Sequence, residues 1–296
     1  MTGKLGISLH IGVERLDPAC YPLKPPHPDW PDGWDGPLLG CANDARDMQS
    51  IAESQGFEST VLMTENATAD NVIAAIREAS KRLSSGDIFM LTYAGHGGQV
   101  LDRSGDEADR EDETWCLYDR HLLDDELYSL YADFDAGVRI LIFSDSCHSG
   151  TVNRGGSEAA GRSVRAMPRN SVFQIYKARE SFYNDIQDRV AAEGDKEVKA
   201  TIRLFSACQD HQEATGAEEN GFFTAAVKRV WDGGNFTGDY DEFYEAVKAD
   251  LVAAHAKAGD DRGPAELTAD AGAQVPNRSA EGAENRDFDR QRPFSI

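Results

Sequence analysis

The sequence predicts an α/β fold in which helices cover both faces of a mostly parallel central sheet. Two runs rich in apolar residues, at 87–93 and 138–144, have the length and composition of strands that are buried on both sides. Segments with helical spacing alternate with strand-like segments along the chain, which is typical of strand–helix–strand units. Together these observations indicate one sheet with both faces covered.

The elements of the first third follow in order. Residues 5–13 read as a first strand, and a loop rich in Pro, Gly and Trp covers 17–39. A helix is expected over 43–54 and a short strand over 59–63. Apolar residues at helical spacing predict an amphipathic helix over 69–83, which ends at Ser-Ser-Gly.

The remaining elements lie after the strand at 87–93. An acidic loop at 102–113 leads to a short strand at 115–118, and acids in its first turn favour a helix over 124–131. A segment rich in Gly, Ser and Arg at 150–170 is expected to be exposed and mobile. Further along we expect a buried strand at 200–207 and helices at 222–230 and 242–257.

The chain is expected to form one main domain, 1–258, with a loop-rich extension, 259–296, that packs on it. Residues from 259 to about 290 are small and polar, which predicts loop. Within the extension, only 290–296 is expected to be able to add an edge strand.

Composition limits the partners. The formal net charge is −22 and the pI is near 4.6, which argues against nucleic acid because its phosphates require clustered Lys and Arg. No apolar run is long enough to span a membrane, and the first residues lack the features of a signal peptide. Five cysteines without a C-x-x-C pair suit a reducing cytoplasm, so we expect a cytoplasmic protein without a disulfide framework.

A histidine and a cysteine follow the two buried strands. His96 lies between glycines that permit a tight turn, and Cys147 is followed by His-Ser-Gly. Because parallel strands present their carboxyl ends at one edge of a sheet, both side chains are expected to face one crevice. A thiol beside an imidazole is the minimum for nucleophilic catalysis. The neighbouring His148 is expected to pack structurally.

Three separate strings carry a resemblance to a known family: Gly-His-Gly at 95–97, Asp-Ser-Cys-His-Ser-Gly at 145–150 and Ser-Ala-Cys-Gln-Asp at 206–210. They resemble the metacaspases, most closely the bacterial orthocaspases. The resemblance runs from about residue 5 to 230 and recurs at 291–294. It implies a caspase-like α/β fold and a cysteine endopeptidase that cleaves after Arg or Lys rather than Asp.

The resemblance also implies roles. Cys147 is the nucleophile and His96 the general acid and base, while the backbone N–H groups of Gly97 and Cys147 form an oxyanion hole. No cofactor is required for this chemistry. The partners implied are peptides or proteins with a basic residue before the cleaved bond, and the enzyme is expected to be a monomer.

Two carboxylates are expected to select the basic residue. Asp145 lies two residues before Cys147, so on an extended segment both point to the same side. Asp44 matches the metacaspase position that shares this pocket, and paired carboxylates suit a guanidinium. Alternatively Asp44 is the N-cap of the following helix. Cys41 either lines the pocket or simply packs, and Ala94 replaces the serine of many relatives.

The resemblance also implies a calcium site, of which this sequence keeps three of the four family positions. The metacaspase calcium site carries over to Asp112, Asp124 and Asp125, but the fourth family position is Arg154, which removes a ligand and adds repulsion. In the alternative reading the acidic loop is a solvated rim, and the paired acids at 124 and 125 cap a helix.

Self-cleavage is expected in the segment after the nucleophile. The candidate sites are Arg154, Arg162, Arg165 and Arg169; the alternative is that they are only surface arginines. Two other functions compete with a peptidase: a catalytically silent caspase-fold protein that binds calcium or acts as a scaffold, and another Cys–His enzyme such as an acyltransferase or amidase.

Overall fold

The protein is described here by a computed structural model covering residues 3–101, 111–147, 163–194, 196–207, 215–216, 219–257 and 276–296. Its strands are β1 (Gly6–Gly12), β2 (Glu58–Met63), β3 (Ile88–Ala94), β4 (Gly97–Leu101), β5 (Glu111–Cys116), β6 (His121–Leu123), β7 (Arg139–Asp145), β8 (Ser163–Val164), β9 (Thr201–Ser206), β10 (Thr215–Gly216) and β11 (Asn277–Gly282). Its α-helices are α1 (Cys41–Ser54), α2 (Ala69–Arg82), α3 (Asp124–Tyr131), α4 (Arg169–Ala178), α5 (Glu180–Glu193), α6 (Phe222–Trp231), α7 (Tyr240–Lys257) and α8 (Arg286–Asp289).

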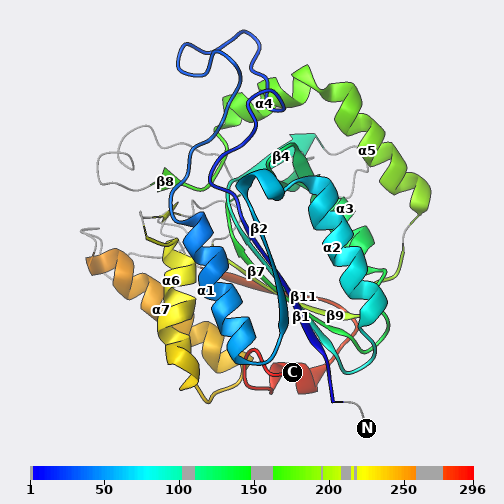
Figure 1. Cartoon of the computed structure of the whole chain (residues 1–296), viewed down its shortest axis with the longest axis vertical. Helices are drawn as coiled ribbons and strands as arrows, with labels where there is room; N and C mark the ends of the chain where they lie inside the picture. Colours follow the sequence, from blue (N-terminus) through cyan, green and yellow to red (C-terminus); the bar gives the residue numbers. More distant parts are fainter. Residues whose placement is uncertain are drawn as a thin grey trace.

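A six-stranded sheet in the order β11-β9-β7-β3-β1-β2 forms the centre of the molecule (Figure 1). Neighbouring strands are parallel except at the edge, where β11 runs antiparallel to β9. Helices α1, α6 and α7 cover one face and α2 and α3 cover the other. The predicted α/β class, with helices on both faces of a mostly parallel sheet, is confirmed.

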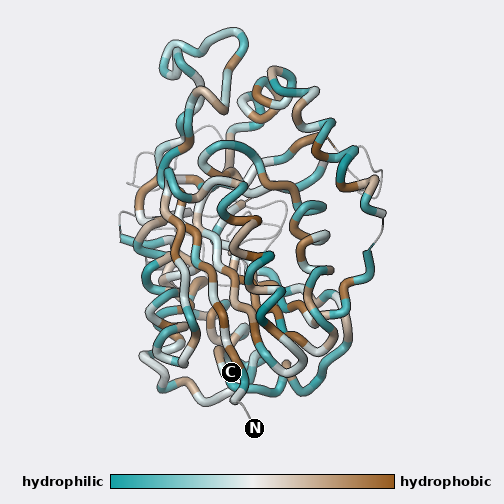
Figure 2. The backbone as a smooth tube through the Cα atoms, turned by 45° about the vertical axis from the view of Figure 1, so that its right-hand side comes forward, coloured by the Kyte–Doolittle hydropathy of each residue, from teal (hydrophilic) through white to brown (hydrophobic). Residues whose placement is uncertain are grey.

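Apolar burial on both faces explains why the central strands read as continuous hydrophobic runs. All seven residues of β3 and all seven of β7 are buried, and Figure 2 shows hydrophobic colouring along the interior strands with hydrophilic turns outside. On α2 the fully buried Val72 and Ile76 lie one turn apart. Each such side chain contributes about 1.5–3 kcal/mol when removed from water.

The edge strand lies at a different place from the expected one. It forms at Asn277–Gly282, whereas 290–296 continues from α8 without a strand. Residues 259–275 of the extension are outside the described part of the chain. β11 lacks an alternation of apolar and polar residues, and backbone hydrogen bonds to β9 hold it at the edge of the sheet. Hydrophobic periodicity therefore could not predict this strand.

Two further differences concern the middle of the chain. The short strand expected at 115–118 is β5, Glu111–Cys116, which pairs with β4 and β6 in a small antiparallel sheet. Helices α4 and α5 lie in a stretch for which the sequence patterns predict no element.

None of the described helices is both long enough and apolar enough to cross a membrane.

Candidate active site

The two strands that precede His96 and Cys147 are direct neighbours. β3 and β7 pair in parallel so that Ala94 lies opposite Asp145, the last residue of each strand. His96 and Cys147 each follow two residues later, and both are buried, with exposures of 5% and 0%. The parallel register therefore brings the two side chains to the same edge of the sheet, as the sequence predicts.

The His96 ring is oriented by the long loop after β1. Its Nε2 lies 3.0 Å from the carbonyl oxygen of Gly36, and the ring of Trp34 packs against it at 4.8 Å between centroids. A carbonyl only accepts, so Nε2 carries the proton and Nδ1 is left as the basic nitrogen. Nδ1 has no hydrogen-bond partner among the described residues. Burial lowers the pKa of His96 to about 3, so the ring is neutral near pH 7.

Sequence reasoning did not identify the two residues that hold this ring. Gly36 adopts φ +47°, and a Cβ there would lie 2.8 Å from the Trp34 ring and 3.1 Å from Cδ2 of His96. Glycine is therefore required both for the left-handed backbone and for the close approach. A Trp and a Gly in a loop rich in both residues carry no local signal of this role.

The segment 163–167 lies beside His96 and Cys147. Before Arg165, β8 pairs antiparallel with β10. After Arg165, Ala166 pairs with Gly97, and the Met167 N–H donates to the Gly97 carbonyl over 2.8 Å. The segment thus runs as an extended peptide between β10 and the start of β4.

The Arg165–Ala166 peptide bond meets the groups that the resemblance assigns to catalysis. The carbonyl oxygen of Arg165 accepts from the N–H of Gly97 at 3.0 Å and from the N–H of Cys147 at 3.1 Å. The backbone of Ala166 lies close enough to His96 to raise its pKa, against the larger effect of burial. Two donors on one carbonyl are the arrangement that stabilises a developing oxyanion.

The side chain of Arg165 fills the pocket between the two predicted carboxylates. Its Nη2 lies 2.6 Å from Oδ2 of Asp44, and its Nη1 lies 3.2 Å from Oδ1 of Asp145. Nη1 also donates to the main-chain carbonyl of Asp145. Arg165 is completely buried, so the expectation of an exposed segment is wrong at this position. Two buried carboxylates supply the opposite charge that makes this burial possible.

Asp44 is not the N-cap of α1. The helix begins at Cys41 with Gly40 as its N-cap, and Asp44 lies inside the first turn with 1% exposure. Burial raises the pKa of Asp44, the Arg165 charge lowers it and the Asp145 charge raises it, and together these effects place it at about 6. A cation is therefore the natural occupant of the pocket, because it favours the charged form of Asp44.

The other candidate residues are placed as follows. Cys41 is buried with Leu38 and Ala94, and burial raises the pKa of its thiol to about 12 even though the Arg165 charge lowers it. It therefore remains a neutral thiol that packs near the pocket. Arg169 is exposed on the first turn of α4, whereas Arg165 occupies the space between the carboxylates. Arg154, Arg162 and His148 lie outside the described residues.

Two of the three predicted calcium ligands accept hydrogen bonds within the protein. Asp112 accepts a hydrogen bond from the Gln187 side chain at 2.7 Å, and an oxygen of Asp124 accepts from the N–H of Asp125. Within the ranges that the structure describes, no three His, Cys, Asp or Glu side chains are grouped so as to hold a metal ion. Calcium binding at Asp112, Asp124 and Asp125 therefore stays a prediction, and no catalytic step below depends on it.

Asp124 gives a testable dependence of stability on pH. Burial first, and then the charge of Asp112, raise its pKa to about 8. A carboxyl whose pKa is raised on folding lowers stability as the pH rises through that value, because the unfolded chain ionises it more easily. In a Cys147→Ala background, Asp124→Asn should raise Tm at pH 8 by about 3 °C or more, with a much smaller effect at about pH 4, near the pKa of an unfolded aspartate. The exposed Asp133→Asn is the control, and an equal gain at both pH values would contradict this explanation.

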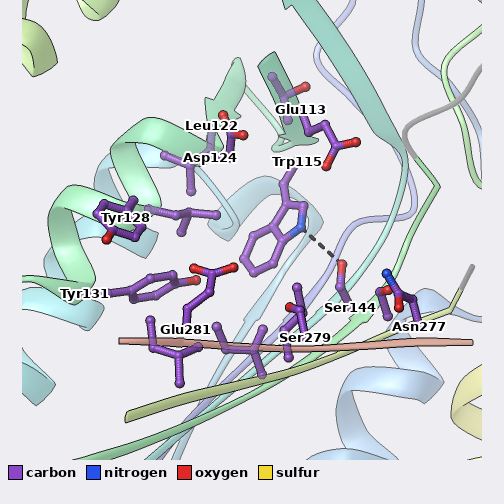
Figure 3. A pocket seen from close by; sticks show the side chains of 16 residues that line it. Glu113, Trp115, Leu122, Asp124, Tyr128, Tyr131, Ser144, Asn277, Ser279 and Glu281 are labelled. Atoms are coloured by element: carbon purple, nitrogen blue, oxygen red, sulfur yellow. Dashed lines mark hydrogen bonds between the residues drawn. The ribbon is translucent and has the colours of Figure 1, made fainter. Parts of the chain in front are cut away.

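A separate cavity of about 320 Å³ lies on the α3 side of the sheet (Figure 3). Trp115 stands in its centre, with Asp124 and Glu281 on its walls. The indole Nε1 donates to Oγ of Ser144 at 3.2 Å, and Ser144 in turn lies 2.9 Å from Oγ of Ser146. The cavity contains neither His96 nor Cys147, but this chain of hydrogen bonds connects its wall to the residue before the cysteine.

Comparison with known proteins places this site in a family. The family model described as the caspase domain matches residues 27–285. The chain belongs to the caspase-domain family. Metacaspase-1 of Schizosaccharomyces pombe is 28% identical over 235 residues, which cover 64% of this chain and 54% of that protein. Metacaspase-1 of Pyricularia oryzae is 35% identical over 134 residues, covering 40% of this chain and 34% of its own.

Solved structures agree with the fold. A crystal structure of a Geobacter sulfurreducens protein is 42% identical with a TM-score of 0.80, covering 99% of both chains. Caspase-1 of Spodoptera frugiperda shares the fold at 14% identity, with a TM-score of 0.53 and coverage of 93% and 86%. The predicted resemblance to metacaspases and the caspase-like fold are thus confirmed, and the chain is a member of a family of cysteine peptidases. It spans about half the length, or less, of the metacaspases it matches.

Proposed function

We propose that this caspase-domain protein is a cysteine endopeptidase that cleaves after arginine or lysine, and that it first cleaves its own Arg165–Ala166 bond. The observation that carries the proposal is the double engagement of Arg165. Its guanidinium lies between two buried carboxylates while its carbonyl accepts from the N–H groups of Gly97 and Cys147. A peptide held at both its side chain and its scissile carbonyl is in the position of a substrate.

The reaction follows from this placement. The Cys147 thiol transfers its proton to Nδ1 of His96 while sulfur attacks the carbonyl carbon of Arg165. The resulting oxyanion is stabilised by the two N–H donors, which contribute about 3–4 kcal/mol each in such sites. His96 then protonates the nitrogen of Ala166, the C–N bond breaks, and a thioester forms. Water hydrolyses the thioester, giving a carboxylate on Arg165 and a free amine on Ala166.

The same contacts favour basic over acidic residues before the cleaved bond. An aspartate in the pocket would face two carboxylates across a few ångströms, where water does not screen the repulsion. An arginine instead pairs with both carboxylates and offsets one of their two negative charges. The net charge of −22 attracts basic substrates at longer range.

An Arg165→Ala variant tests the proposal. In the wild-type chain, self-cleavage should yield a new amino terminus that reads Ala-Met-Pro, from residue 166 onward. Arg165→Ala should abolish that product because alanine cannot occupy the acidic pocket. The pocket is then open from the start, so this variant should hydrolyse an arginine peptide without the lag that the wild-type chain shows.

Arg169→Ala is the matched control, since it removes an exposed arginine from α4 and leaves the pocket contacts intact. It should cleave itself as the wild type does. N-terminal sequencing and intact mass identify the bond. Two results would show that Arg165 is not the processing site. One is cleavage of the Arg165→Ala variant after residue 165, and the other is cleavage of the wild-type chain only at other bonds.

A further inference from the structure

The first turn of α6 contacts both carboxylates of the arginine pocket. Asp145 Oδ2 accepts from the backbone N–H of Thr224 at 3.0 Å and from its hydroxyl at 2.7 Å. Asp44 Oδ1 accepts from the Asn220 side chain at 2.8 Å and from the N–H of Gly221 at 3.0 Å. One short piece of chain therefore binds two acids that come from β7 and α1.

Asp145 performs for α6 the role that an N-cap side chain usually performs. The N-cap of α6 is Gly221, which has no side chain to accept from the helix. Thr224 is the third residue of the helix, and its N–H is a group that N-cap side chains normally satisfy. The positive end of the helix dipole also favours an ionised carboxylate there. The acid that faces the substrate is thus anchored by the helix.

Each acid presents one oxygen to the guanidinium. Oδ2 of Asp145 is bound by Thr224, and Oδ1 lies 3.2 Å from Nη1 of Arg165. Oδ1 of Asp44 is bound by Asn220 and Gly221, and Oδ2 accepts from the Gly221 N–H at 3.1 Å and lies 2.6 Å from Nη2. The two oxygens that meet the guanidinium therefore come from different elements, β7 and α1, and each contacts a different nitrogen of the arginine fork.

Gly221 provides the space for that fork. A Cβ at this position would lie 2.2 Å from Oδ2 of Asp145 and 2.7 Å from both Cζ and Nη1 of Arg165. Its φ of −61° and ψ of 146° are ordinary for any residue, so glycine is needed here for space and not for conformation. A side chain would close the pocket where the guanidinium widens.

We propose that the first turn of α6, through Thr224 and Gly221, makes this pocket selective for arginine over lysine. A lysine ammonium is a single point that ends about where Cζ of arginine lies, so it cannot contact both anchored oxygens at once. If Thr224 no longer holds Asp145, the carboxylate can turn toward a single ammonium, and the advantage of the fork decreases. Thr224 is a positioning residue, since it contacts Asp145 and not the substrate. This inference rests on the proposed peptidase function.

The test uses self-cleaved enzyme and two peptides that differ only in Arg or Lys before the scissile bond. Thr224→Val removes the hydroxyl but keeps the branched shape of the side chain. Thr224→Ser is the conservative variant, because it keeps the hydroxyl. We expect Thr224→Val to lower kcat/KM for the arginine peptide about 10-fold, mainly through KM, and to change the lysine value less than about 2-fold. Thr224→Ser should return the Arg/Lys ratio to within about 2-fold of wild type. Thr60→Val, on the exposed side of β2, should leave both values unchanged.

Gly221→Ala is the second variant, and it should reduce cleavage of the arginine peptide more than that of the lysine peptide. Circular dichroism melts identify any variant that fails to fold, in which case the other variant decides. An Arg/Lys ratio that is unchanged in folded Thr224→Val and Gly221→Ala overturns this inference while the peptidase function stands. Failure of the wild-type enzyme to cleave either peptide instead refutes the proposed function itself.

Discussion

Replacing Cys147 with alanine is expected to leave the chain uncleaved and to abolish hydrolysis of arginine peptides. The Arg165 carbonyl would keep both N–H donors, which belong to the backbone, but no sulfur could attack it. Where the nucleophile of a protease is removed on its own, kcat falls by roughly 10⁶. Intact mass after prolonged incubation and a fluorogenic peptide assay measure both effects.

Cys20→Ala is the control for this variant. Cys20 is a half-buried thiol whose pKa is raised by burial and by Asp17, and it lies in the loop after β1. The Cys20→Ala variant should self-cleave at the wild-type rate. Cleavage at Arg165 in Cys147→Ala at more than about one percent of the wild-type rate would mean that another group is the nucleophile.

The second large effect is expected at Asp145, which has two functions that can be separated. Asp145→Asn removes the charge but keeps an oxygen that can accept from Thr224, whereas Asp145→Ala removes both. Loss of one partner of a buried charge pair costs about 2–5 kcal/mol, or roughly 30- to 5000-fold in kcat/KM for an arginine peptide. Both variants should show this loss.

Stability distinguishes the two variants. Asp145→Ala also removes the cap of α6 and should lower the free energy of unfolding by about 0.5–2 kcal/mol more than Asp145→Asn, measured with urea in a Cys147→Ala background. If Asp145→Asn cleaves arginine peptides as the wild type does, the carboxylate is not part of the specificity pocket.

Local sequence patterns predict the central strands and the positions of the residues that follow them. Continuous apolar runs identified β3 and β7, and the rule for parallel strands then brought His96 and Cys147 to one edge. Asp145 followed from its place on the same extended segment as the cysteine. These inferences need only short stretches of sequence and the period of a strand.

Local patterns do not predict contacts between residues that are distant along the chain. Asn220 and Gly221 contact Asp44 across more than 170 positions, and no local pattern encodes such a pair. Composition also misjudged Arg165, because an arginine among Gly and Ser predicts an exposed loop unless the buried carboxylates that receive it are known. The strand β11 was misplaced for a related reason, since an edge strand without apolar alternation resembles loop.

The most direct test compares two peptides that differ only in having Arg or Asp before the scissile bond, with self-cleaved enzyme and Cys147→Ala as the blank. Two buried carboxylates at the pocket predict that kcat/KM is at least about 100-fold higher for the arginine peptide. The blank should cleave neither peptide. Equal rates on the two peptides, or preference for aspartate, would contradict the proposed arginine-directed pocket.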